Sequence, residues 1–121
     1  MKKYLLTFLA LGILLLLYLL LAPPRWYLNL TKRVDVSPEV GAALVEKHDC
    51  CSCHVIGGEG AFKSPNLDTA VQSKTLSTLG AWLANPRNME TNTAMPNVRL
   101  SDSEMEAILS FLARPTENAL I

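Results

Sequence analysis

Residues Lys47–Gly58 read KHDCCSCHVIGG, and this short stretch contains all three cysteines and both histidines of the chain. Counted from Cys50, it has the spacing Cys-x-x-Cys-His, with Cys53 as the second cysteine and His54 directly after it. This spacing is the attachment pattern of c-type haem. The sequence therefore predicts one covalently bound haem c, attached through Cys50 and Cys53 and ligated at its iron by His54.

The spacing has a physical reason. Two thiols three positions apart on one helical turn can each add to a vinyl group on the same porphyrin edge, while the adjacent imidazole is delivered beneath the iron. A zinc site is disfavoured, because such a site needs about four nitrogen or sulfur ligands and no cysteine or histidine occurs elsewhere in the chain. A thioredoxin-like redox pair is also disfavoured, because no strand pattern precedes the cysteines.

Three segments on either side of this stretch carry helix signals. Ser37-Pro38-Glu39 combines a hydroxyl cap, a proline at the first helical position and an acid in the first turn, which predicts a helix to about residue 48. Helical spacing of leucines predicts a second helix over 75–86. Ser101 and Glu104 form a capping box that opens a third helix over 101–112. Three short helices make a thin core, so a group other than side chains is expected to fill it.

An iron bound by one histidine needs a sixth ligand unless it binds gas, and the four methionines are the candidates. Met1 lies across the predicted membrane span, and Met105 lies on the apolar stripe of the last helix, where core packing is expected. Met89 and Met95 share a loop that could place a thioether against the porphyrin face opposite His54. Met95 is favoured, because a proline follows it and fixes the chain there in an extended path.

Four segments, GAALVEKHDCCSCH, SPNL, LGAWLANP and TAMPNVRLSDSEMEAILSFL, occur in this order between residues 37 and 112. Together they resemble the class I cytochromes c of bacteria. The resemblance implies an all-α fold of three helices wrapped round a covalently held haem, with histidine and methionine as axial ligands. It implies that Met95 is the methionine ligand, that Pro65 offers its carbonyl to Nδ1 of His54, and that Leu67 belongs to the cofactor-binding residues.

The same resemblance implies that Gly41 lets the first of these helices cross the last one against Phe111. The chain departs from the family at three positions. Val45 stands where an aromatic residue is common, Ser64 stands where a glycine usually precedes the proline, and Cys51 is an unusual cysteine between the two attachment cysteines. Cys51 is expected to be a spectator beside the haem edge.

Residues 4–22 read YLLTFLALGILLLLYLLLA, an uncharged run that as a helix would span roughly 28 Å, close to the thickness of a bilayer's hydrocarbon core. Lys2 and Lys3 ahead of it would also suit a cleaved signal peptide. A signal's apolar region is shorter, about 7 to 15 residues, and ends in small residues, whereas Leu20 and Pro23 stand at those positions here. The sequence therefore favours a retained membrane anchor.

These features predict three parts: an anchor over 1–22, a linker without sustained periodicity over 23–36, and a cytochrome c domain over 37–121. Residues 23–121 carry nine of the eleven basic residues, all but Lys2 and Lys3, and all eleven acids, which gives a formal charge of minus two. No basic surface points to nucleic acid as a partner.

With His54 on one side and Met95 on the other, the iron would have no vacant position, so outer-sphere transfer of single electrons is the expected function. The chain is expected to be an electron-transfer protein and no enzyme itself, either a tethered carrier or a fixed subunit of a respiratory or photosynthetic complex. Expected partners are the lipid bilayer and redox proteins: a quinol-oxidising donor and a terminal oxidase or reaction centre.

A leucine-rich span with few small residues favours the carrier, and the apolar tail NALI at 118–121 favours docking. The expected location is the bacterial cytoplasmic membrane, crossed once, with the amino terminus inside and the haem domain outside, where the family's maturation takes place. The alternative is a haem-based sensor or peroxidase, which would require Met95 to leave the iron.

Overall fold

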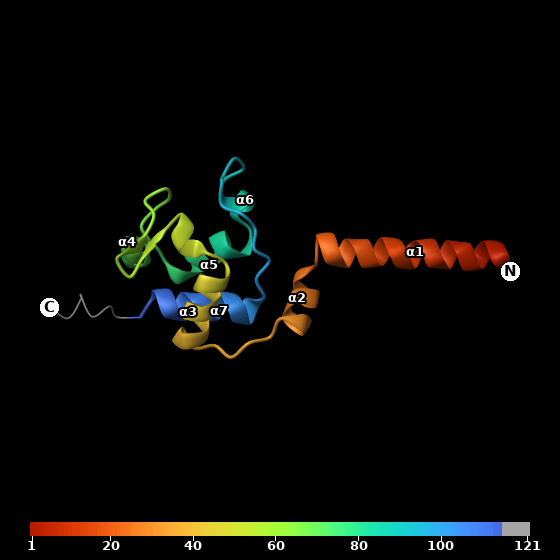
Figure 1. Cartoon of the computed structure of the whole chain (residues 1–121), viewed down its shortest axis with the longest axis horizontal. Coiled ribbons are helices and arrows are strands. Elements are labelled where there is room, and N and C mark those ends of the chain that lie inside the picture. Colours follow the sequence, from red (N-terminus) through yellow and green to blue (C-terminus); the bar gives the residue numbers. More distant parts are fainter. Residues whose placement is uncertain (115–121) are drawn as a thin grey trace.

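The computed structural model describes residues 1–114, and it begins with a long apolar helix set apart from a small helical domain (Figure 1). Helix α1 spans Lys2–Leu21 and buries none of its residues. Within the described residues it is the one helix long and apolar enough to cross a membrane, judged by length and composition. The expected anchor therefore forms a continuous helix with no residue buried by the rest of the described chain, residues 22–114.

The three helices expected from the sequence are confirmed. They are α3 (Pro38–Lys47), α5 (Leu76–Ala84) and α7 (Asp102–Leu112), and each has a hydroxyl side chain at its N-cap. The capping box of α7 is complete, since Ser101 Oγ accepts from Glu104 N at 3.2 Å and Ser101 N donates to Glu104 Oε2 at 2.9 Å. Capping acts within one turn, which is why the sequence alone located the starts of α3 and α7, whereas α5 was located from the spacing of its leucines.

Further elements were not expected. Short helices α4 (Leu67–Ser73) and α6 (Pro86–Met89) and the 3-10 turn η1 (Cys50–Ser52) fill the connections between the three main helices. Two-residue strands β1 (Val55–Ile56) and β2 (Glu59–Gly60) follow the cysteines and pair in antiparallel register, a hairpin that no strand pattern in the sequence indicated. Gly57 and Gly58 permit the hairpin because both adopt positive φ, 63° and 78°. The fold remains helical.

Helices α3 and α7 pack against each other and form the centre of the domain. Their contact is closest at Gly41, where an added Cβ would overlap the carbonyl oxygen of Ala107 and lie 2.7 Å from Cβ of Phe111. The expected crossing of the first and last helices at Gly41 is therefore present. Around it the buried side chains form one cluster, with Met105 packed on its edge as expected. The members of the cluster are Leu44, Val45, Ile56, Leu100, Ala107 and Ile108.

We expect Gly41→Ala to lower the free energy of unfolding of the haem-loaded protein by about 1–3 kcal/mol, because the new methyl group meets backbone that can move only with α7. Denaturant titration followed by helical circular dichroism measures the change. Gly80→Ala is the matched control, since its Cβ would meet only Leu109 Cδ1 at an ordinary 3.5 Å. Alanine favours the helix over glycine, so this control should be neutral or stabilising. Equal losses in both variants would contradict the close crossing.

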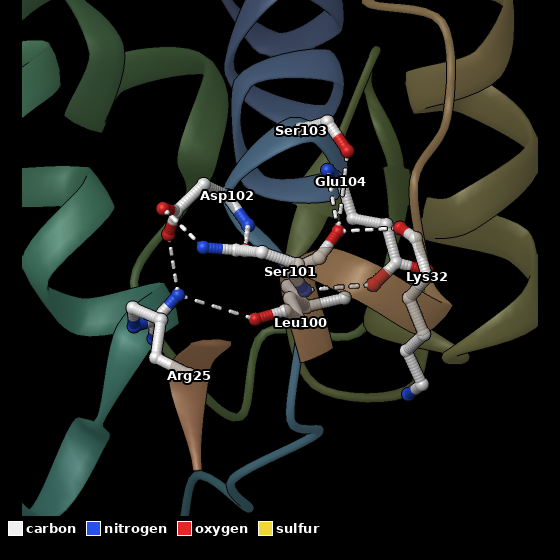
Figure 2. A network of polar contacts seen from close by, with 8 residues as sticks. Arg25, Lys32, Leu100, Ser101, Asp102, Ser103 and Glu104 are labelled. Atoms are coloured by element: carbon white, nitrogen blue, oxygen red, sulfur yellow. Dashed lines mark hydrogen bonds and ion pairs between the residues drawn. The ribbon is translucent and has the colours of Figure 1, made fainter. Parts of the chain in front are cut away.

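The segment over 23–36, which was expected to be a linker without sustained periodicity, contains a short helix. Residues Arg25–Thr31 form helix α2, and its Leu28 is buried. Figure 2 shows how the segment is fastened at the start of α7: Arg25 Nη1 lies 2.6 Å from Asp102 Oδ1, and Ser101 Oγ donates to the carbonyl of Lys32 at 2.6 Å. The residues in these pairs are some 70 positions apart in sequence. A further hydrogen bond of this kind runs from Val34 N to Ser103 Oγ, between residues 69 positions apart. No local pattern could reveal such pairs.

Candidate haem-binding site

A cavity of about 300 Å³ lies between the attachment segment, α4, α5, the loop before α7 and α7 itself. Five of the six residues proposed from the sequence line it: Cys50, His54, Pro65, Leu67 and Met95. Cys53, the sixth, is half-buried but does not belong to the described lining. Most of the remaining wall is aliphatic, including Val45, Ile56, Leu79, Leu83, Ile108 and Leu112.

The attachment segment is shaped by the end of α3. Asp49 takes a left-handed backbone with φ of 52°, which turns the chain out of the helix and into η1. Within the turn, His54 N donates to the carbonyl of Cys50 at 3.0 Å, and Cys53 N donates to the same oxygen at 3.3 Å. This one turn holds both thiols and the imidazole in fixed relative positions, and it directs Cys50 and His54 to the cavity.

The orientation of the His54 imidazole is set by the chain that follows it. Nδ1 of His54 lies 2.8 Å from the carbonyl oxygen of Pro65, so the expected hydrogen bond is present. A carbonyl oxygen can only accept, which assigns the proton to Nδ1 and leaves the lone pair on Nε2. An imidazole held in this tautomer is ready to ligate a metal through Nε2.

The sequence reasoning missed two residues that hold this segment. Gly60, with φ of 124°, passes so close that an added Cβ would overlap the carbonyl oxygen of His54. Asp68, in the first turn of α4, accepts from the backbone N–H groups of Gly57 at 2.7 Å and Gly58 at 2.9 Å. In the sequence, Gly60 is marked only as the third glycine of the run GGEG, and Asp68 only as an acid at a helix start. Neither feature identifies the residue that it contacts.

The four methionines are separated clearly by the fold. Met95 is half-buried and lines the cavity, and its backbone N–H donates to Thr93 Oγ1 at 3.2 Å. Met89 ends α6 with 42% of its surface exposed and is not in the described lining, while Met105 packs on the core. Met1 is fully exposed at the start of α1. Met95 is therefore the methionine that shares a cavity with His54.

Trp82 and Lys74 also line the cavity, and the sequence reasoning did not single them out. The polar part of the wall also includes Ser64, Thr93 and the acid Glu90. The N–H groups of Lys74 and Trp82 are donors that would suit the carboxylates of a haem. The donor set as a whole fits haem c: a thiol at the edge, an imidazole with a free Nε2 and a thioether in one hydrophobic cavity. All three cysteines are free in the structure, so thiols are present for thioether formation.

Two groups near the site have shifted pKa values. Burial raises the pKa of the Cys50 thiol, and the neighbouring Cys51 and Asp49 add to the effect, so this thiol stays protonated at neutral pH. Burial, followed by the charge of Lys47, lowers the pKa of His48. His48 caps the end of α3, and its Nε2 is buried without a hydrogen-bond partner among residues 1–114. It is not among the residues that line the cavity.

Comparison with known proteins gives a consistent result. A family model described as cytochrome c matches residues 38–114. The C subunit of nitric oxide reductase from Paracoccus denitrificans is 32% identical over a 96-residue alignment that covers 68% of this chain and 64% of that relative. The protein of the same name from Halomonas halodenitrificans is 30% identical over 112 residues, with 81% of this chain and 74% of that relative covered.

A more distant relative is cytochrome c oxidase subunit 2 of Alkalihalophilus pseudofirmus, 23% identical over 100 residues that cover 72% of this chain but only 29% of that protein. The chain thus spans less than two thirds of the Paracoccus relative and under a third of the oxidase relative. All three relatives are named as subunits, two of a nitric oxide reductase and one of a cytochrome c oxidase.

Proposed function

The chain belongs to the cytochrome c family, and from this premise we propose that it is the membrane-anchored electron-donating subunit of a nitric oxide reductase-type complex. It is an electron-transfer protein with covalently bound haem c and is not itself catalytic. When bound, the haem supplies an iron that gains and loses one electron. The single observation that carries the proposal is the meeting of His54 and Met95 in one apolar cavity.

The roles of the residues follow from their positions. Cys50 and Cys53 would hold the haem through thioether bonds, and His54 and Met95 would ligate its iron. Pro65 keeps the proton of His54 on Nδ1 and so presents Nε2. Leu67 belongs to the apolar wall of the cavity, which would exclude water from the cofactor. Two protein ligands leave no iron position for a substrate, so these residues support electron transfer and no chemistry on a bound molecule.

A fixed subunit agrees better with this fold than a swinging carrier does. A carrier needs a flexible tether, whereas the segment after α1 forms α2 and is joined to the start of α7 by several hydrogen bonds. The leucine-rich span favoured the carrier on sequence grounds, but the fastened segment outweighs that argument because it limits the reach of the domain. The tail NALI, which favoured docking, lies outside the described residues.

Helix α1 is long and apolar enough to cross a membrane once, which supports a single-pass membrane protein. For the orientation we propose the amino terminus in the cytoplasm and the haem domain on the outer face. The support is the site of haem attachment, because c-type maturation in this family takes place outside the bacterial cytoplasmic membrane.

Extraction of the full-length, haem-loaded protein in mild detergent tests the proposal. We expect the haem-stained band on a native gel to migrate with a larger integral membrane protein, and reduction of the haem by a one-electron donor to be followed by reduction of that companion. A haem-stained protein that migrates alone, yet exchanges electrons, would support the tethered carrier over the fixed subunit. A haem that no one-electron donor reduces would contradict electron transfer in either form.

A further inference from the structure

Helix α2 has two different faces. Trp26 and Leu30 are one helical turn apart and are 65% and 75% exposed, while Leu28 on the opposite face is 6% exposed and packs into the protein. Figure 1 shows α2 turned away from the axis of α1 and placed between the end of α1 and the helical domain. An exposed tryptophan and leucine next to a membrane span are typical of the interface between lipid headgroups and acyl chains.

The length of α1 determines where the residues that follow it lie relative to the bilayer. Its 20 residues extend about 30 Å, which matches the hydrocarbon core of a bilayer. Ala22 and Pro23, which follow directly, therefore lie at the level of the headgroups. The part of the domain that contacts these residues must face the same layer.

A second cavity, of about 470 Å³, lies at this level. Its apolar side is formed by Ala22, Pro23, Leu28 and Ala84. Its polar side contains two arginines and three asparagines and no acidic residue: Arg25, Arg99, Asn85, Asn88 and Asn97. The cavity is within the size range of small-molecule sites, and its composition suits an anion with an attached apolar part.

Several donors in this cavity are free. Within residues 1–114, the side chains of Asn85, Asn88 and Arg99 make no hydrogen bond or ion pair, whereas Arg25 is held by Asp102 at 2.6 Å. The loop that carries Arg99 is itself fixed, because Asn97 Oδ1 accepts from Arg99 N at 3.0 Å and Lys32 Nζ donates to the carbonyl of Arg99 at 3.2 Å. The free guanidinium and amides are thus attached to backbone that is already positioned.

We propose that this cavity binds the phosphate of an anionic phospholipid headgroup, with the acyl chains running beside α1. Arg99 and the amides of Asn85 and Asn88 are the donors to the phosphate oxygens. A free phosphate would satisfy the same donors, but a lipid is presented at high local concentration where Ala22 and Pro23 leave the membrane. The bound headgroup contacts α2, α6 and the loop before α7 that carries Arg99, all at the membrane surface. It thereby fixes the orientation of the domain relative to the membrane. The proposal depends on membrane anchoring and not on the electron-transfer partner.

Native mass spectrometry of the full-length, haem-loaded protein in detergent tests this site. Phosphatidylglycerol and phosphatidylcholine are titrated separately, and the fraction of protein carrying one lipid is measured. We expect phosphatidylglycerol to bind more tightly than phosphatidylcholine. Arg99→Asn should weaken the binding of phosphatidylglycerol about fivefold, because one cation near the membrane surface contributes about that factor to the affinity for an anionic lipid. Asparagine tolerates the left-handed backbone of this position, where φ is 55°, so the variant should fold. Arg99→Lys should retain most of the binding.

Arg87→Asn is the matched control, because Arg87 is an exposed arginine of α6 outside the described lining of this cavity. Equal losses in Arg87→Asn and Arg99→Asn, or equal binding of the two lipids by the wild type, would overturn the proposal. Displacement of the lipid by millimolar inorganic phosphate would show a site for free anions instead. Release of a companion protein by Arg99→Asn, without any change in lipid binding, would assign the cavity to a protein interface.

Discussion

Cys53→Ser and Cys50→Ser are each expected to reduce or abolish covalent haem attachment, while Cys51→Ser should leave it intact. The reason is the fixed turn of η1, which offers thiols three positions apart, together with His54, to one porphyrin. The measurement is haem staining on a denaturing gel, supported by extraction with acidified organic solvent, which removes haem that is not covalently bound. This is the largest effect expected in the molecule, because the cofactor itself is lost.

Cys51→Ser is a strong control because the positions of Cys51 and Cys53 in the structure do not show which of the two is the second attachment cysteine. Cys51 and Cys53 are both half-buried, and neither belongs to the described lining of the haem cavity. The assignment of Cys53 therefore depends on the spacing to His54. Full haem content in Cys53→Ser together with loss in Cys51→Ser would show that the attachment pair was assigned wrongly.

Met95→Ala is expected to lower the midpoint potential of the haem. Thioether ligation favours ferrous iron relative to nitrogen or oxygen ligation, and the choice of axial ligands spans roughly 0.8 V across haem proteins. The variant should also lose the weak near-infrared sulfur-to-iron absorption of the oxidised form, and its ferrous form should bind carbon monoxide. Redox titration and absorption spectra of the full-length protein measure all three changes.

Two other methionines provide the controls. Met89 is exposed at the end of α6, so Met89→Ala should leave potential and spectrum unchanged. Met105 packs on the core, so Met105→Ala should keep the near-infrared band but lower the free energy of unfolding by about 2 kcal/mol, the low end for a partly buried side chain.

Loss of the band in Met89→Ala, with retention in Met95→Ala, would leave electron transfer in place but identify a different ligand. Ready binding of carbon monoxide by the wild-type ferrous protein at neutral pH would contradict a saturated iron. The sensor or peroxidase alternative would then be preferred.

The sequence by itself determined the features whose causes are local. The starts of α3 and α7 follow from N-cap hydroxyls that bond within one turn, and α5 follows from the helical spacing of its leucines. The long apolar helix follows from an uninterrupted apolar run. The attachment motif is equally local, since the thiols and the imidazole lie within five consecutive residues. The resemblance to class I cytochromes c added the hydrogen bond between His54 and Pro65 and the crossing at Gly41, and both are present.

Only the tertiary structure decided which residues meet across long stretches of chain. It places Met95 in the same cavity as His54 and leaves Met89 outside, a choice for which the sequence offered only the proline after Met95. It also turns the segment expected to be a linker into α2, because Leu28 finds a buried position and Asp102 binds both Arg25 and Asn29. A seven-residue helix has too few internal hydrogen bonds to be stable alone, so its existence depends on contacts with α7 that no local pattern records.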